Sequence, residues 1–157
     1  MAQRDQKDAL NSAYRTLARR AYSRRELQGK LERKKYSQVT IRAVLDELEA
    51  KKFLDDRAFA INFVRDRLHR RHFGRERVAL ELKNRGIGED LIEESLESLS
   101  GELNEKALAQ CALNKKLHAM KRSPNASDRR RLADFLRRRG FSFDTIRKTL
   151  KFENEIC

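Results

Sequence analysis

The sequence predicts an all-α protein of about nine helices, arranged in three tandem three-helix (helix-turn-helix-like) repeats that form an elongated, curved molecule. Composition is the first reason. The 157 residues include only six glycines, one proline and no tryptophan, which argues against a β-rich or loop-rich fold. Two further reasons are an apolar pattern that recurs three times and the turn-forming residues that recur with it. Repeats of about 50 residues bury little surface alone, so neighbouring repeats should share part of their core.

The apolar pattern is anchored on three leucines, Leu31, Leu82 and Leu136. A large apolar residue stands four positions before each anchor, and others stand five, ten and fourteen positions after it. With the anchors, the set is Leu27, Leu31, Tyr36, Ile41 and Leu45; Val78, Leu82, Ile87, Ile92 and Leu96; Leu132, Leu136, Phe141, Ile146 and Leu150. This spacing predicts two short helices joined by a tight turn in each repeat, with these side chains in the core.

Turn-forming residues mark the ends of these helices. The residues four positions after the anchors, which suit a left-handed helix C-cap, are Lys35, Gly86 and Gly140. The residues eight positions before the anchors, predicted to be N-caps, are Ser23, Gly74 and Asp128. Six positions after the anchors stand further candidate caps, Ser37, Gly88 and Ser142. Each repeat therefore contains a helix, a tight turn and a helix.

A longer helix is predicted before each of these pairs. Residues with helical spacing are Leu10, Ala13, Tyr14, Leu17, Ala18 and Ala21 in the first repeat; Phe59, Ala60, Phe63, Val64 and Leu68 in the second; Leu103, Ala107, Leu108, Cys111, Ala112 and Leu113 in the third. Asp55 or Asp56 would cap the second of these helices. The predicted repeats span residues 9–52, 53–101 and 102–153, and residues 123–127 form a loop inside the third.

The charge balance is strongly basic. Lysine and arginine number 37 and aspartate and glutamate 24, a formal net charge of +13. Such a charge favours polyanions or acidic protein surfaces as partners. The segment from Glu89 to Glu105 is an exception, because it contains seven acids and no base.

Sequence features also predict where the protein works. The chain contains no apolar run near the roughly 20 residues that a membrane span needs, and no apolar segment of a secretory signal opens it. Two cysteines, Cys111 and Cys157, cannot form a disulfide framework or a thiolate zinc site. Cys111 is predicted to lie in the core. We expect a cytoplasmic protein, with no membrane association and a monomeric state.

No catalytic or cofactor motif was found, and we expect neither an enzyme nor a bound cofactor or metal. There is no phosphate-binding glycine loop and no dinucleotide fingerprint. His69 and His72 have a spacing that could share a helix face, but two arginines and no carboxylate cluster accompany them, which favours a solvated basic face. Asp55 and Asp56 are adjacent, so they point apart on a helix and suit capping better than acid–base chemistry.

Clusters of arginine are the candidate binding residues, because the guanidinium fork suits phosphates and carboxylates. The candidates are Arg70, Arg71, Arg75 and Arg77 in the second repeat, with Arg129, Arg130, Arg131, Arg137, Arg138 and Arg139 in the third. Phe73 and Tyr22 lie among basic residues, where they would either stack on bases or, as we prefer, anchor a turn in the core. Sequence-specific reading of a major groove is disfavoured, because Gly88-Glu89-Asp90 opens one candidate recognition helix with acids.

Two stretches carry a resemblance to the RecX family. The central one reads Phe53-Leu54-Asp55-Asp56-Arg57-Ala58-Phe59-Ala60, followed by Arg67-x5-Phe73-Gly74-x2-Arg77-Val78-x2-Glu81-Leu82-x2-Arg85-Gly86-Ile87. Upstream, Ala18-Arg19-Arg20-x2-Ser23-x2-Glu26-Leu27-x3-Leu31 is similar to the family's N-terminal pattern. The resemblance covers residues 9–152, although Lys35-Tyr36 replaces a turn that often contains glycine, and the third repeat matches mainly by its apolar pattern.

The resemblance implies a fold of tandem three-helix repeats and a regulatory function. RecX proteins bind the RecA recombinase filament in its helical groove, inhibit its ATPase, strand-exchange and coprotease activities, and modulate the SOS response and recombinational repair. Members of the family also bind DNA. Two alternatives remain open from the residues alone: a generic DNA- or RNA-binding helical protein, and an adaptor for another acidic protein.

Overall fold

Nine α-helices and no strand make up the computed structural model, which describes residues 2–102 and 104–151. They form unit 1, with α1 (Ala2–Leu17), α2 (Arg24–Arg33) and α3 (Gln38–Ala50); unit 2, with α4 (Asp56–His69), α5 (Arg75–Asn84) and α6 (Glu89–Ser98); and unit 3, with α7 (Glu105–Met120), α8 (Asp128–Arg138) and α9 (Phe143–Lys151). The predicted all-α fold of three tandem three-helix repeats is confirmed.

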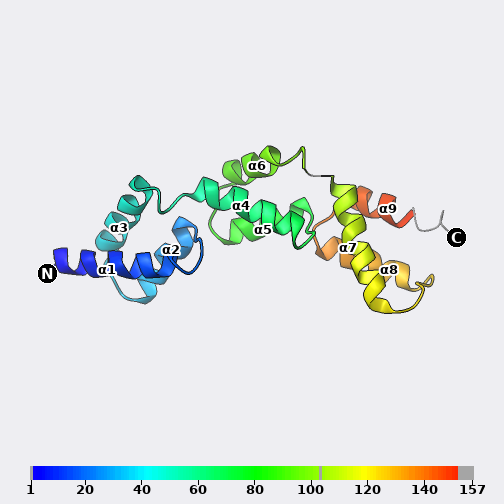
Figure 1. Cartoon of the computed structure of the whole chain (residues 1–157), viewed down its shortest axis with the longest axis horizontal. Coiled ribbons are helices and arrows are strands. Elements are labelled where there is room, and N and C mark those ends of the chain that lie inside the picture. Colours follow the sequence, from blue (N-terminus) through cyan, green and yellow to red (C-terminus); the bar gives the residue numbers. More distant parts are fainter. Residues whose placement is uncertain (1, 103, 152–157) are drawn as a thin grey trace.

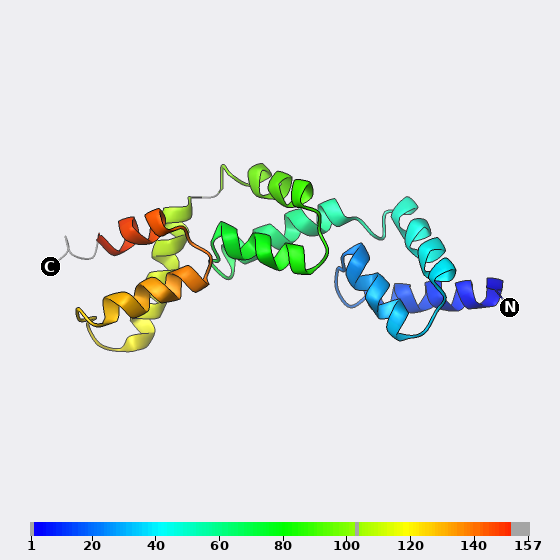
Figure 2. The same ribbon diagram turned by 180° about the vertical axis from the view of Figure 1, so that it is seen from behind.

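The three units follow one another along a single long axis (Figure 1). Unit 1 lies at one end and unit 3 at the other, and the view from behind shows the same row, with unit 2 raised between its neighbours (Figure 2). The elongated, curved shape predicted from the repeat is therefore present. No helix in the described part of the chain is long and apolar enough to cross a membrane.

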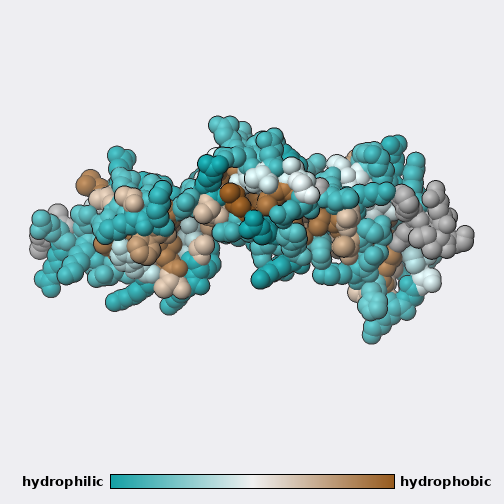
Figure 3. Space-filling view, turned by 45° about the horizontal axis from the view of Figure 1, so that its top comes forward, coloured by the Kyte–Doolittle hydropathy of each residue, from teal (hydrophilic) through white to brown (hydrophobic). Residues whose placement is uncertain are grey.

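Each unit has its own small core, built on the repeated apolar positions. Fourteen of the fifteen pattern residues are buried, and the three anchoring leucines are at most 1% exposed. Tyr36 is the exception among the fifteen: it is half-buried and its hydroxyl donates a hydrogen bond to Asp8 Oδ2 at 2.7 Å. Leu108 of α7 packs against the cores of both unit 2 and unit 3. The molecular surface seen in Figure 3 is mostly hydrophilic, with small separated apolar patches.

The predicted turns have the expected backbone. Lys35, Gly86 and Gly140 adopt φ values of 64°, 80° and 89°, in the left-handed region that closes a helix C-terminus. Ser23 and Glu26 form a reciprocal capping box at the start of α2. Asp55, and not Asp56, caps α4 by accepting a hydrogen bond from Ala58 N at 3.0 Å.

Several local predictions were wrong. Ala18 and Ala21 are exposed because α1 ends at Leu17, so the helical spacing does not continue to Ala21 as predicted. Cys111 and Ala107 are exposed, since the buried side of α7 follows Ala109, Ala112 and Leu113. Asp128 is not an N-cap but the first residue of α8, after Ser127. Leu103, which was assigned to the helical pattern of the third repeat, and Cys157 lie outside the described residues.

Equivalent positions join the units at two junctions. At the first, between units 1 and 2, Ser23 Oγ donates to Arg85 O at 2.5 Å. At the second, between units 2 and 3, Gly74 N donates to Arg139 O at 2.7 Å, and Glu76 N to Gly140 O at 3.2 Å. Ser23 and Gly74 occupy the same repeat position, as do Arg85 and Arg139. The C-terminal turn of the middle helix of each later unit thus rests on the N-terminus of the middle helix before it.

Candidate nucleic-acid interface

The ten candidate arginines lie in three places, which the structure brings only partly together. Arg129, Arg130 and Arg131 follow one another in the first turn of α8, whereas Arg137 and Arg138 end that helix. At about 1.5 Å per residue, the two ends of α8 are roughly 15 Å apart. The end of α8 meets the α4–α5 loop and the start of α5 at the second junction, where Arg77 Nη1 donates to Arg138 O at 3.0 Å. The candidates of unit 2 and the last three of unit 3 therefore surround this junction.

Ion pairs already occupy some of these side chains. Arg75 pairs with Glu93, and Arg77 Nε pairs with Glu81 Oε1 at 3.1 Å. Arg70 is 84% exposed and lies 3.5 Å from Asp66, while Arg137 is 3.7 Å from Asp134. Within residues 2–102 and 104–151, the candidate side chains with no ion pair within 4 Å are those of Arg71, Arg129, Arg130, Arg131, Arg138 and Arg139; the charge of Arg131 also acts on the Asp128 carboxylate. All of these but Arg139 are exposed, so they are the ones available to an external anion.

Arg139 differs from its neighbours because it packs between aromatic rings. Its guanidinium stands over Phe73 at 5.0 Å and over Phe135 at 5.1 Å. Arg77 lies over Phe73 at 4.4 Å, and Lys116 over Phe135 at 5.4 Å. These contacts form a ladder of alternating cations and rings that bridges units 2 and 3.

The predicted anchoring role is confirmed for Tyr22, which is 8% exposed and has Arg20 over its ring at 3.5 Å. Phe73 is half-buried, and two guanidinium groups of the chain itself cover it. Neither ring is arranged as an open platform for stacking bases.

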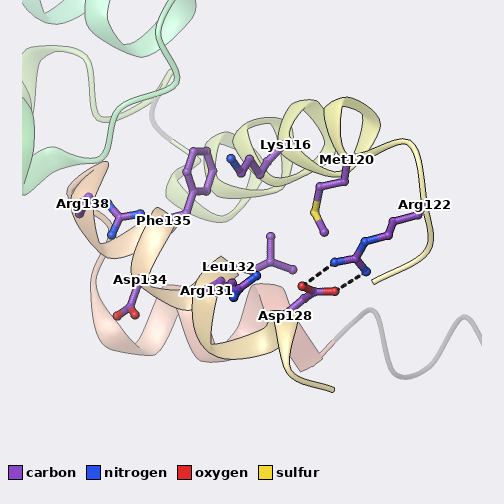
Figure 4. Close-up of a pocket in the computed structure, with 9 residues that line it drawn as sticks. All are labelled: Lys116, Met120, Arg122, Asp128, Arg131, Leu132, Asp134, Phe135 and Arg138. Carbon is purple, nitrogen blue, oxygen red and sulfur yellow. Dashed lines mark hydrogen bonds and ion pairs between the residues drawn. The ribbon is translucent and has the colours of Figure 1, made fainter. Parts of the chain in front are cut away.

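A hollow of about 380 Å³ between α7 and α8 was not predicted from the sequence (Figure 4). Met120, Leu132 and Phe135 form its apolar part, and Lys116 lies beside them. Arg122 and Asp128 face each other at its far end, with Arg122 Nη1–Asp128 Oδ2 at 2.7 Å and Nη2–Oδ1 at 2.9 Å. This bidentate pair ties the loop after α7 to the start of α8. The pair is not visible in the sequence, because Asp128 stands at a position that also suits an N-cap.

The Asp128 carboxylate is held in its charged form. Its side chain is 3% exposed, and it accepts hydrogen bonds from Arg122 and from Asn125 N. The guanidinium of Arg122, then the backbone N–H of Asn125, lower the pKa of Asp128 to about 2 from an ordinary value of 3.8. The stabilisation is therefore complete above pH 4 and is lost as the pH falls through 2.

We expect Asp128→Asn to lower the Tm at pH 7, because the amide cannot accept the bidentate pair. The matched control is Asp134→Asn on the same helix, where the carboxylate is 44% exposed and lies 3.7 Å from Arg137. Thermal unfolding followed by circular dichroism should show a clear loss for Asp128→Asn and almost none for the control. The difference should shrink between pH 4 and pH 2. Equal losses at pH 7 would mean that the Arg122–Asp128 pair does not stabilise the loop.

The acidic stretch is largely matched by bases of the same unit. Glu93 pairs with Arg75, Glu94 with Arg57, and Glu89 Oε1 with Lys83 Nζ at 3.0 Å. Glu102 Oε2 lies 3.1 Å from His69 Nε2. The stretch is thus mainly a set of partners for unit 2, and it leaves unit 3 as the more basic end of the molecule.

His72 lies in the α4–α5 loop with a left-handed φ of 51°. Its Nδ1 is buried and has no hydrogen-bond partner among the described residues. Burial lowers its pKa, and Lys115 of α7, Arg139 after α8 and His69 of α4 lower it further. The folded protein therefore binds a proton at His72 less readily than the unfolded chain, whose histidine pKa is near 6.5.

It follows that His72 favours the folded state above pH 6.5, and that this contribution is lost as the pH falls below that value. We expect the free energy of unfolding in urea to fall from pH 7.5 to pH 5.5, and to fall less in His72→Asn, since asparagine tolerates a left-handed backbone. The control is His118→Asn, an exposed residue of α7. A pH response in His72→Asn equal to that of the wild type would contradict this assignment.

Three family models match this chain, each described as a three-helix domain of RecX. The first covers residues 9–48, the second residues 55–96 and the third residues 104–150. The matches follow the order of the three units along the chain, and each spans parts of all three helices of its unit.

Curated proteins named "Regulatory protein RecX" are similar over most of their length. That of Prosthecochloris aestuarii is 37% identical over 152 residues, which cover 96% of this chain and 96% of the relative. That of Halorhodospira halophila is 38% identical over 140 residues, covering 87% and 83%. The crystal structure of RecX from Lactobacillus salivarius has the same fold, with a TM-score of 0.81, 19% identity and coverage of 99% of both chains. The three domain matches and these relatives show that the chain belongs to the RecX family.

Proposed function

We propose that this protein is a non-catalytic regulator that binds in the helical groove of the RecA–DNA filament. There it inhibits the ATPase, strand-exchange and coprotease activities of RecA and so modulates DNA repair and the SOS response. The observation that carries the proposal is that all three RecX three-helix domains are present in one continuous row. A row of this kind suits a partner that is itself extended and repetitive.

Inhibition follows from occupancy of the groove. A protein that lies across neighbouring protomers either blocks extension of the filament or holds the protomers in one relative position, so that ATP turnover stalls. Neither route needs a catalytic group in the bound protein. The basic side chains of units 2 and 3 would face DNA phosphates or acidic groups of the filament.

The ten candidate arginines do not contribute equally in this proposal. The exposed, unpaired ones, which are Arg71, Arg129, Arg130, Arg131 and Arg138, make the external contacts, and Arg70 joins them because it is almost fully exposed. Arg75, Arg77 and Arg137 first have to leave intramolecular ion pairs. Arg139 acts within the junction. The protein is proposed to work as a monomer in the cytoplasm.

A generic nucleic-acid-binding protein is the second candidate, favoured by the unpaired arginines of α8. Surface plasmon resonance on one immobilised single-stranded DNA separates the two. The strand is used bare, or coated with RecA and a slowly hydrolysed ATP analogue. We expect binding at physiological salt to be at least about ten-fold tighter on the coated strand, a difference of about 1.4 kcal/mol. Equal or tighter binding to the bare strand would contradict the filament as target.

A further inference from the structure

The two junctions use the same repeat positions with opposite electrostatics. Five positions before the anchor stand Glu26 in unit 1 and Arg77 in unit 2; three positions after it stand Arg85 in unit 2 and Arg139 in unit 3. At the first junction the pair is complementary, with Arg85 Nη1 2.6 Å from Glu26 Oε1. At the second, the equivalent residues are two arginines. The second junction therefore lacks the counter-charge that the first one contains.

The cations at the second junction are only partly satisfied. Arg139 donates through Nη2 to the carbonyl oxygen of Arg71, whereas its Nε is buried without a hydrogen-bond partner among the described residues. The Nδ1 of His72 is also buried and has no hydrogen-bond partner among those residues. Two buried polar atoms on facing elements thus have no partner of their own. Buried polar groups are nearly always hydrogen-bonded in folded proteins, so these two atoms call for a partner from outside the chain, either an ordered water or a bound ion.

Within residues 2–102 and 104–151, no carboxylate forms an ion pair with Arg71, His72, Lys115 or Arg139. Burial lowers the pKa of Arg139, and the charges of Arg77 and Arg71 lower it further. The pKa of His72 is lowered by burial and by the charges of Lys115, Arg139 and His69. Glu81 lies near Arg77, but it is shared with Arg67 Nε at 2.8 Å. The side chains of Arg71 and Lys115 are exposed, so an anion can approach from solvent.

We propose that a phosphate group binds between units 2 and 3, held by Arg71 and His72 of the α4–α5 loop, Lys115 of α7 and Arg139 after α8. It supplies the counter-charge that Glu26 supplies at the first junction, and it clamps the two units together. Arginine and lysine suit such an oxyanion, and the ligand is either free phosphate or a phosphate of a nucleic-acid backbone. The assignment of this phosphate to a nucleic-acid backbone rests on the proposed function, whereas the site itself does not.

The test is a titration of the full-length ¹⁵N-labelled protein with inorganic phosphate, at constant ionic strength maintained with chloride. We expect saturable shifts of the Gly74 and Gly140 amides and little change at Ser23 and Gly86 of the first junction. Arg71→Gln/Lys115→Gln should lose the response at the second junction. The control Arg42→Gln, an exposed arginine of α3, should keep it. Shifts of equal size at both junctions, or none that saturate, would overturn the proposal.

Arg77→Glu tests the same idea in the opposite direction. It gives the second junction the carboxylate that the first has, at a helix N3 position where glutamate is favourable. The change also removes the Arg77–Glu81 ion pair and the hydrogen bond to Arg138 O, so the readout is the response to phosphate and not the Tm in chloride. We expect phosphate to raise the Tm of the wild type and to leave that of Arg77→Glu unchanged. A phosphate response that persists in Arg77→Glu and in Arg71→Gln/Lys115→Gln would refute the site.

A second titration with a short single-stranded oligonucleotide identifies the source of the phosphate. Shifts of the same amides would assign the site to a nucleic-acid backbone, whereas a response to inorganic phosphate alone would assign it to free phosphate. Either result supports the site. If the filament binds normally in the resonance experiment while neither ligand moves these amides, this inference fails and the proposed function stands.

Discussion

Gly74→Ala is expected to loosen or separate units 2 and 3. Gly74 has φ −78°, which any residue adopts, so the effect would be purely one of space. A Cβ added there would lie 2.3 Å from Gly140 O and 2.6 Å from Phe141 N, both backbone atoms that cannot turn aside. The Gly74 N–Arg139 O hydrogen bond of 2.7 Å would lengthen or break. Overpacking of this kind costs about 1–3 kcal/mol, sometimes more.

Gly88→Ala is a close control, because Gly88 also precedes a helix and has a similar φ of −68°. Nothing lies within 4 Å of a Cβ added there. Urea unfolding should show the loss for Gly74→Ala only, and small-angle X-ray scattering should show a changed radius of gyration for that variant alone. If the two variants unfold at the same urea concentration and scatter alike, the junction is not the close contact described here.

Replacing Arg129, Arg130 and Arg131 together by alanine is expected to weaken filament binding by roughly ten- to a hundred-fold. Each lost phosphate contact removes about 0.7 from the slope of log K against log salt on a single strand, so three contacts remove about 2. The fold should persist, because the three side chains are exposed and alanine favours helix. Titrations at several salt concentrations give both the affinity and the slope.

Arg4, Arg15 and Arg42, all exposed in unit 1, form a control with the same change in net charge. Their joint replacement by alanine should leave the affinity within a few-fold of the wild type. Full inhibition of RecA by the α8 variant at physiological salt would contradict the contact assigned to unit 3. An equal loss in both variants would mean that net charge, and not a particular face, controls binding.

The fold could be predicted from the sequence because the apolar residues that recur in each repeat are the residues that are buried. Leu31, Leu82 and Leu136 are the centres of three separate cores, and the left-handed turn after each helix was visible from its position even where Lys35 replaces glycine. A pattern of this kind depends only on the spacing of residues along the chain, which can be read directly from the sequence.

Tertiary partners were not predictable in the same way. Asp128 suits an N-cap locally, and only the three-dimensional structure shows that its buried carboxylate forms a bidentate ion pair with Arg122. Arg139 is indistinguishable from Arg137 and Arg138 in the sequence, yet it is enclosed at the junction by Phe73 and Phe135. Cys111 keeps helical spacing but faces solvent, because the apolar residues of α7 permit more than one buried side. The sequence contained one indication of the difference between the junctions: Glu26 of unit 1 and Arg77 of unit 2 occupy the same repeat position but carry opposite charges.

Binding to the filament groove is tested most directly by the hydrolysis of ATP by RecA on single-stranded DNA, titrated with this protein at two DNA concentrations and fixed RecA. If the protein acts in the groove, we expect inhibition well below one molecule per RecA, at a concentration that does not change when the DNA is doubled. An inhibitory concentration that rises in proportion to the DNA would mean that the protein competes for DNA sites. That result would contradict the filament groove as its target.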